Sequence, residues 1–109
     1  MDAGALNRRI ELRRAINARG SLNGVDTVWY AIAQVWAAYE PVSDGERVRA
    51  QQLGAEMTAR FRIRWSSDVA DLNAKDQLRF EGALYAISAV KPIGLRDGLE
   101  ITASALGDI

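Results

Sequence analysis

The sequence predicts a mainly all-β protein: a small antiparallel six-stranded β-barrel with one short helix in a long insertion between the second and third strands. Residues 57–65 alternate strictly between apolar and polar side chains, a period of two that is typical of a half-buried strand. Several other strand-like segments are separated by turn residues, and the chain shows no βαβ rhythm. An antiparallel sheet of six strands must close or be covered to protect its edges, so we expect a barrel.

The chain is short and its charges are balanced. Its 109 residues fit one domain, 1–109, with 49% apolar and 26% charged residues. Lysine plus arginine number 14 and aspartate plus glutamate number 14, so the net charge is zero. The protein therefore has no overall electrostatic attraction to nucleic acid or anionic lipid, and any such contact must come from a local cluster of charges.

The missing residue types narrow the chemistry. The chain has no cysteine and no histidine, which removes disulfides, thiolate nucleophiles and the commonest metal ligand and general base. We therefore expect no enzyme activity, no cofactor and no metal site. The sequence offers neither an apolar run for a membrane span nor a signal-peptide core, so we expect no membrane partner and synthesis in the cytoplasm.

The first half of the chain predicts two strands and a loop. Leu6–Arg14 alternates aliphatic and charged residues and is the first strand. Ala15–Asp26 contains turn-forming pairs and few large apolar residues, so a long loop is predicted there. Thr27–Glu40 is rich in aromatic and β-branched residues and ends at Pro41, which favours a long strand. Its alanines favour a helix, and periodicity alone does not decide in a mostly apolar run.

One short helix is predicted from Asp44 to about Glu56. Ser43 and Glu46 form a capping-box pattern, in which the serine hydroxyl and the glutamate carboxylate satisfy free amides of a helix start. Leu53 is the only large aliphatic residue in the middle of this segment, and Gly54 weakens it. A helix that buries so little of itself is expected to be exposed and to face a partner.

The second half of the chain predicts four strands. The alternating strand at 57–65 is followed by a loop at Ser66–Lys75, which is rich in side chains that bond to backbone amides. Three short strands are then predicted at Gln77–Glu81, Ala83–Val90 and Leu99–Ala105, joined by a turn at Glu81-Gly82 and a hairpin turn that ends in Asp97-Gly98.

Acidic residues supply the one set that could serve catalysis or metal binding: Asp44, Glu46, Asp68, Asp71 and Asp97. The loop around Asp68 and Asp71 lacks the oxygen spacing and the glycine of a calcium loop, and turn formation already explains its acids. We interpret this set as structural.

Three arginines of the third strand form the first candidate binding surface. Arg60, Arg62 and Arg64 share one strand face at intervals of about 6.6 to 7 Å, close to the spacing of phosphates along one DNA strand. The row could therefore contact DNA or a neighbouring subunit. The alternative is a solvated face whose arginines pair with acids such as Glu11 or Glu81 on neighbouring strands, and the zero net charge favours it.

The predicted helix forms the second candidate surface. Arg47 and Arg49 lie near its start, where positive charge is slightly unfavourable against the helix dipole. A role in lining a channel or facing a partner would explain them, and so would a plain solvated helix face. The polar residues of this candidate segment are Asp44, Glu46, Arg47, Arg49, Gln51 and Gln52.

The three tryptophans lie inside strands dominated by aliphatic residues. We therefore assign Trp29, Trp36 and Trp65 to packing and not to the stacking of bases. Trp36 is the expected exception, because the small neighbours Ala37 and Ala38 leave room for another chain to approach.

The order of several short motifs resembles the head-tail joining proteins of tailed bacteriophages, which are also called head-closure or stopper proteins. The motifs are Val35-Trp36-Ala37-Ala38 with Glu40-Pro41, Ala55-Glu56 followed by Arg60, Arg62 and Ile63, and Tyr85-Ala86-Ile87 with Val90. The resemblance spans nearly the whole chain. It departs at Asn23-Gly24, where the family often has an acidic residue before glycine, and in the last hairpin, which has few of the usual basic residues.

The resemblance implies a non-enzymatic part of a virion or phage-like particle, assembled in the bacterial cytoplasm. The protein would form a homo-oligomeric ring of six or twelve copies beneath the portal and its adaptor protein. In that family the ring closes the filled head, retains packaged double-stranded DNA and presents the docking surface for the tail, so a tail terminator or tail tube protein is the partner on the other side. The inserted segment, Ser43–Glu56 here, would lie near the central channel.

Two questions stay open at this point. A phage, a prophage or a gene transfer agent could each encode such a protein. The alternative function is a free-standing nucleic-acid-binding β-barrel that uses Arg60, Arg62 and Arg64 and needs no partner ring.

Overall fold

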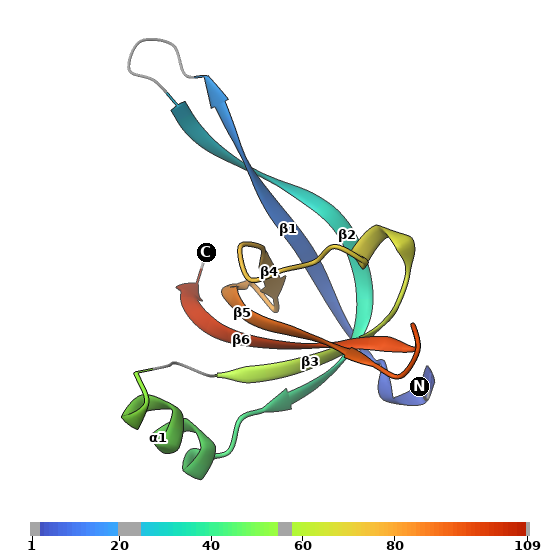
Figure 1. Cartoon of the computed structure of the whole chain (residues 1–109), viewed down its shortest axis with the longest axis vertical. Helices are drawn as coiled ribbons and strands as arrows, with labels where there is room; N and C mark the ends of the chain where they lie inside the picture. The colour runs from blue at the N-terminus through green and yellow to red at the C-terminus, as the bar shows by residue number, and fades with distance from the viewer. Residues whose placement is uncertain (1–2, 20–24, 55–57, 109) are drawn as a thin grey trace.

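The structure is a closed antiparallel barrel of six strands in the order β1-β2-β3-β6-β5-β4 (Figure 1). It is a computed structural model, and it describes residues 3–19, 25–54 and 58–108. A short helix connects the second strand to the third. The predicted fold class, a six-stranded β-barrel with one helix in an insertion after the second strand, is therefore confirmed.

The strands are β1 (Arg8–Arg19), β2 (Val25–Pro41), β3 (Ala59–Arg64), β4 (Gln77–Phe80), β5 (Ala83–Ile93) and β6 (Gly98–Asp108). The helix is α1 (Asp44–Gln52). Two short 3-10 turns, η1 (Ala3–Ala5) and η2 (Ser67–Val69), precede β1 and follow β3. Among the described residues no helix is both long and apolar enough to cross a membrane.

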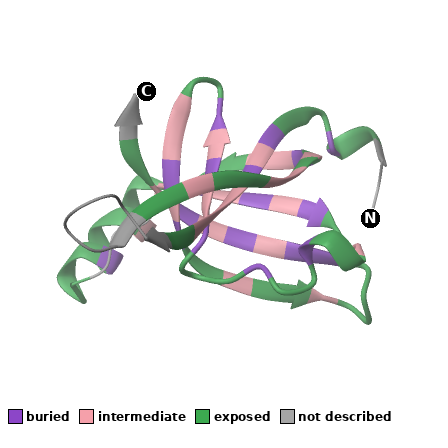
Figure 2. Cartoon of the chain, turned by 90° about the horizontal axis from the view of Figure 1, so that it is seen from above, coloured by how far each residue is buried: buried purple, intermediate pink, exposed green. Residues whose placement is uncertain are grey.

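The core fills the inside of the barrel with alternate side chains of each strand. In β3 the apolar residues Ala59, Phe61 and Ile63 are fully buried, and the arginines between them lie on the outer surface (Figure 2). Phe61 is central, with its ring centroid 5.3 Å from that of Phe80 and 5.5 Å from that of Tyr85. Such edge-on aromatic pairs add about 0.5 to 1.5 kcal/mol each beyond the burial of their area.

The hairpin of β1 and β2 extends beyond the barrel, and the predicted loop over Ala15–Asp26 is wrong for the parts that the structure describes. β1 continues to Arg19 and β2 begins at Val25. The two strands pair with each other throughout, whereas β4 pairs with β1 only at Glu11–Arg13 and β3 pairs with β2 only at Ala37–Pro41. The distal part, residues 14–19 and 25–30, is a two-stranded ribbon that projects from the barrel (Figure 1) and is called the β1–β2 arm below.

A bulge marks the base of this arm. Leu12 pairs with Ala33 and Arg13 pairs with Ala31, so Ile32 is an extra residue in β2. The extra residue changes which side chains of β2 share a face with Leu12. Beyond the bulge that face carries Arg14 opposite Tyr30, followed by Ile16 opposite Val28. The apolar side chains of this face of the arm are 41 to 49% exposed, namely Ile16, Val28 and Tyr30.

Other element ends also differ from the prediction, including that of β6, which is Asp108 and not Ala105. α1 ends at Gln52 and not near Glu56, because Leu53 is its C-cap and Gly54 adopts a φ of +78°, which stops a helix. β5 passes through Pro92, beyond the predicted end at Val90. β4 flanks β5 only as far as Ala86, so the proline lies where β5 has one neighbour and a missing N–H is tolerated. The Ala55-Glu56 motif lies outside the described residues.

Candidate functional site

The insertion between β2 and β3 holds α1 on the outside of the barrel. Ser43 caps the helix, and its Oγ accepts a hydrogen bond from the backbone N–H of Glu46 at 3.2 Å. Of the helix residues only Ala50 is buried, while Val48 and the following Leu53 are 52% and 83% exposed. The helix is exposed, as the sequence predicts, because it has almost no apolar face to bury.

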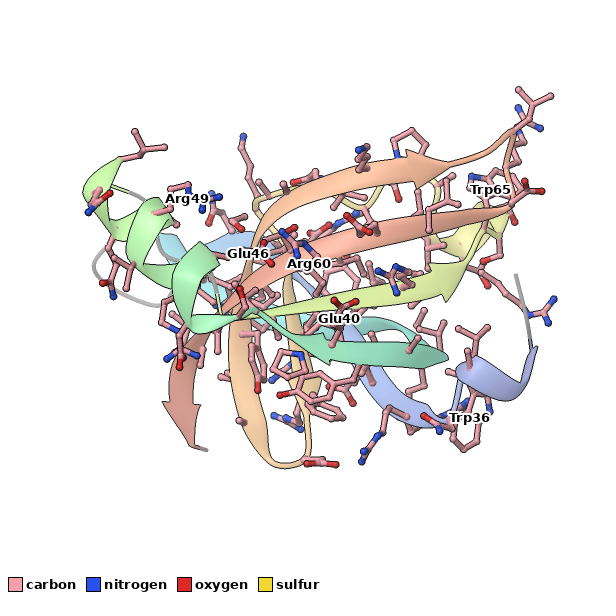
Figure 3. All side chains as sticks on the ribbon, turned by 90° about the horizontal axis from the view of Figure 1, so that it is seen from below. Trp36, Glu40, Glu46, Arg49, Arg60 and Trp65 are labelled. Atoms are coloured by element: carbon pink, nitrogen blue, oxygen red, sulfur yellow. The ribbon has the colours of Figure 1, made fainter. Side chains whose placement is uncertain are left out.

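An ion pair between two candidate residues ties α1 to the barrel. The carboxylate of Glu46, which the capping-box pattern assigns to the amide of Ser43, accepts a hydrogen bond from Nη2 of Arg60 on β3 (Figure 3). This bond lowers the pKa of Glu46 and raises the pKa of Arg60. The two predicted surfaces, the helix and the arginine row, are thus joined at this point.

The other candidate residues of α1 are on the exposed side of the helix. Arg47 lies 3.9 Å from Asp44, whose side chain is almost fully exposed, and Arg49 makes no ion pair within the described part of the chain. Five of the six candidate side chains of this segment are exposed: Asp44, Arg47, Arg49, Gln51 and Gln52. The helix therefore presents a polar surface with two cations that the barrel does not use.

The arginine row is largely neutralised by acids, but not by those that the sequence suggested. Arg62 bonds to Glu40 on β2 at 2.9 Å and to Glu100 on β6 at 3.3 Å. The predicted partners are engaged elsewhere: Glu11 with Arg13 and Arg79, and Glu81 with Arg8. Arg60 is bound to Glu46, as described above. Arg64 is exposed and has no carboxylate partner in the described ranges.

Two tryptophans lie at the end of the barrel opposite α1 (Figure 3). Trp36 is 54% exposed, as its small neighbours predict, and the guanidinium of Arg9, its cross-strand partner, lies 5.1 Å from its ring centroid. The guanidinium of Arg96 lies 5.0 Å from the ring centroid of the half-buried Trp65. Neither Arg9 nor Arg96 could be singled out from the sequence, because the strand register and turn geometry that place them are not readable in the local pattern.

A depression of about 440 Å³ lies between these tryptophans. Its lining residues are Leu6, Arg9, Gln34, Val35, Trp36, Arg64, Trp65 and Ser66. We call this depression the tryptophan groove. It brings Arg64 of the predicted row together with Trp36, the predicted exception among the tryptophans.

One of the loop acids, Asp71, forms an ion pair within the fold. Asp71 accepts a hydrogen bond from Arg14 at 2.9 Å, and this bond lowers the pKa of Asp71. The backbone carbonyl of Asp97, and not its carboxylate, accepts a hydrogen bond from the backbone N–H of Trp65. Within the described residues no three side chains of the metal-ligating types Asp, Glu, His and Cys converge on one point.

Comparison with known proteins identifies the family. A family model described as "Phage head completion protein" matches residues 1–106. The solution structure of protein SF1141 from Shigella flexneri 2a is similar, with a TM-score of 0.75, 24% sequence identity and 97% of each chain covered, which supports the fold. Comparison with curated proteins finds no match. Because the family model spans nearly the whole sequence, the resemblance drawn from the motifs is confirmed, and the chain belongs to the phage head completion proteins.

Proposed function

We propose that the protein is a structural connector of the virion, which forms a ring between the portal or its adaptor and the tail. In this role it retains packaged double-stranded DNA and provides the docking surface for the tail. Membership of the head completion family supports a structural part in closing the phage head and a location in the virion. The proposal includes no catalytic step, and it takes a ring of six or twelve copies as the assembly.

The exposed insertion carries this proposal. α1 buries one residue, is held to β3 by the ion pair of Glu46 with Arg60, and directs Arg47 and Arg49 away from the barrel core. A helix this short and this exposed gains little stability from its own barrel. Its polar surface is suited to line a channel that holds DNA, because exposed cations attract phosphates without requiring a fixed sequence.

The β1–β2 arm supports assembly into a ring. An isolated two-stranded ribbon is marginally stable in water, and this one exposes Ile16, Val28 and Tyr30 on one face. Contact with a neighbouring protomer would bury that face and give the ribbon a second layer to pack against.

The alternative of a free DNA-binding barrel has less support. It relies on Arg60, Arg62 and Arg64, and two of these already bond to carboxylates of the same chain. A phosphate would have to compete with Glu46, Glu40 and Glu100 for them. A mobility shift of short duplex DNA by the isolated protein, abolished by moderate salt, would favour this alternative.

Electron microscopy of particles tests the connector role. Particles are compared from a host strain in which the gene is deleted and from one in which it is restored. We expect tailless heads, many of them empty, beside separate tails in the deletion, and whole particles after complementation. Normal tailed particles in the deletion strain would refute the connector role.

A double charge reversal tests the channel role of α1. We expect Arg47→Glu with Arg49→Glu to produce heads that lose DNA, because the helix would then repel phosphates. The matched control is Lys75→Glu with Lys91→Glu, which makes the same change of charge at two exposed lysines outside the helix. If the α1 variant retains DNA as well as the control does, the channel role is wrong.

A further inference from the structure

The tryptophan groove is a concave surface that neither the core nor the α1 surface uses. Its lining is mostly apolar and includes Leu6, Val35, Trp36 and Trp65. A volume of about 440 Å³ accommodates one or two bulky side chains of another molecule, and it lies at the small end of the range for ligand sites. The half-exposed ring of Trp36 gives such a side chain a flat surface to contact.

The charge of the groove is positive. Arg9 and Arg64 line it, and Arg96 lies over the ring of Trp65. Within the described ranges none of these three arginines pairs with a carboxylate, whereas most other arginines there do. The lining itself contains no acidic residue. In a chain with zero net charge, these unpaired cations gather around one apolar depression.

The apolar lining and the unpaired positive charge together indicate what kind of molecule the groove binds. The phosphates of double-stranded DNA would match the arginines, but the apolar group that the duplex presents, the thymine methyl, is too small to fill the space lined by Trp36 and Trp65. A purely apolar segment would fill that space and leave the cations unpaired. An extended peptide with a bulky apolar side chain between carboxylates satisfies both requirements.

We propose that the tryptophan groove binds an extended acidic segment of another protein, anchored by one large apolar side chain. The anchor lies between Trp36 and Trp65, and carboxylates on either side of it pair with Arg9 and Arg64. Arg9 already lies against the exposed ring of Trp36, so a carboxylate can reach it from solvent. This inference is independent of the connector role, because it concerns binding by the isolated protein.

Synthetic peptides and nuclear magnetic resonance of the whole ¹⁵N-labelled chain test the proposal. The probe is the capped hexapeptide Glu-Asp-Phe-Leu-Asp-Glu. The chain has three tryptophans, so the indole N–H signals of Trp36 and Trp65 report on the groove, while that of Trp29, on β2 at the arm, is an internal control. We expect the two groove signals to shift on titration and the Trp29 signal to stay in place.

Matched peptides and variants identify the cause of binding. A peptide with lysines at the acidic positions, and one with alanines for Phe-Leu, should each bind at least about tenfold more weakly, because each lacks one of the two required properties. The double variant Arg9→Glu with Arg64→Glu should weaken binding of the acidic probe by about tenfold or more. The control Lys75→Glu with Lys91→Glu makes the same change of charge at two exposed lysines outside the groove and should leave the affinity unchanged.

Three results would overturn the proposal. The first is an acidic probe that shifts neither groove signal. The second is an affinity that the Arg9→Glu, Arg64→Glu double variant does not reduce. The third is binding of single-stranded oligothymidine at the same two indoles with no response to the peptide, which would make the groove a site for stacked bases instead.

Discussion

Arg14 of β1 and Asp76, which lie 62 positions apart in the sequence, form a two-point ion pair at the base of the β1–β2 arm. Nε of the guanidinium donates to Oδ1 at 3.0 Å and Nη2 donates to Oδ2 at 2.9 Å. Asp76 is 2% exposed and also accepts the backbone N–H of Asn73 at 3.0 Å. The pair therefore fixes the loop before β4 against the strand that leaves the barrel.

Removing Arg14 should destabilise the protein strongly. Arg14→Ala leaves the carboxylate of Asp76 buried without its cation, and we expect the free energy of unfolding to fall by about 3 kcal/mol. Urea denaturation measures the change. The control is Arg8→Ala, which breaks the exposed pair with Glu81 and should cost less than about 1 kcal/mol. If both variants lose the same free energy of unfolding, then the buried Arg14–Asp76 pair stabilises the fold no more than an exposed pair does.

The attachment of α1 should depend on pH. The folded state lowers the pKa of Glu46 because Arg60 bonds to its carboxylate, so the pair contributes above the ordinary value of 4.5 and is lost as the pH falls through the lowered pKa. We expect hydrogen exchange of the α1 amides to speed up in acid relative to those of β3. Glu46→Gln should reproduce this loss at neutral pH.

The matched control for the pH effect is Glu40→Gln, which removes a partner of Arg62 and does not touch the helix. It should leave exchange in α1 unchanged. If the helix amides exchange at the same rate in Glu46→Gln as in the unaltered protein, then contacts other than this ion pair hold the helix.

Gly94 should tolerate alanine poorly. It lies in the turn between β5 and β6 with a φ of +60°, and an added Cβ would stand 2.1 Å from Oδ2 of Asp97. We expect Gly94→Ala to lower the free energy of unfolding by about 1 to 2 kcal/mol from the backbone conformation, with a further cost for displacing Asp97. Gly82→Ala has a similar positive φ and no atom within 4 Å, so it isolates the backbone cost. If both variants lose the same free energy of unfolding, then the Asp97 side chain moves away from the added Cβ at no cost.

The exposed face of the arm should matter for assembly more than for folding. Val28→Lys with Tyr30→Ser changes side chains that are 46% and 41% exposed, so the free energy of unfolding should move by less than about 0.5 kcal/mol per site. Particle assembly should fail, because the proposed protomer contact would lose its apolar surface. Leu95→Lys, at a position 94% exposed in the β5–β6 turn, should affect neither. Normal assembly of the arm variant would exclude this face as an interface.

Burial was predicted most accurately from the sequence where a strand keeps one apolar–polar alternation along its whole length. In β3 the alternation is unbroken, and every buried and outer position within the strand agrees with it. The inward-facing residues of β2 were harder to predict. Ile32 is an extra residue at which the inward face changes, so neither half of the strand shows a long regular alternation. The arm was mistaken for a loop because its ends carry small and polar residues, although the pairing of β1 with β2 continues through them.

The sequence predicted which elements carry the candidate residues but not the contacts that these residues make. The pattern around Ser43 located the start of α1, yet it could not show that Glu46 turns towards Arg60 of β3. Likewise, acids opposite the arginine row were expected, but the choice of Glu40 and Glu100 depends on strand order, which joins β3 to β6. Local sequence does not encode such long-range neighbours.

Beyond Arg14 and Tyr30 the described strands of the arm pair only with each other, so the arm can change in length without altering the barrel. Adding one residue to each strand beyond Arg14 and Tyr30 would lengthen it by about 3.3 Å and turn the apolar face over, whereas adding two would restore that face about 6.6 Å farther out. Hairpin length is thus a separate variable by which related proteins could adjust how far one protomer extends towards its neighbours.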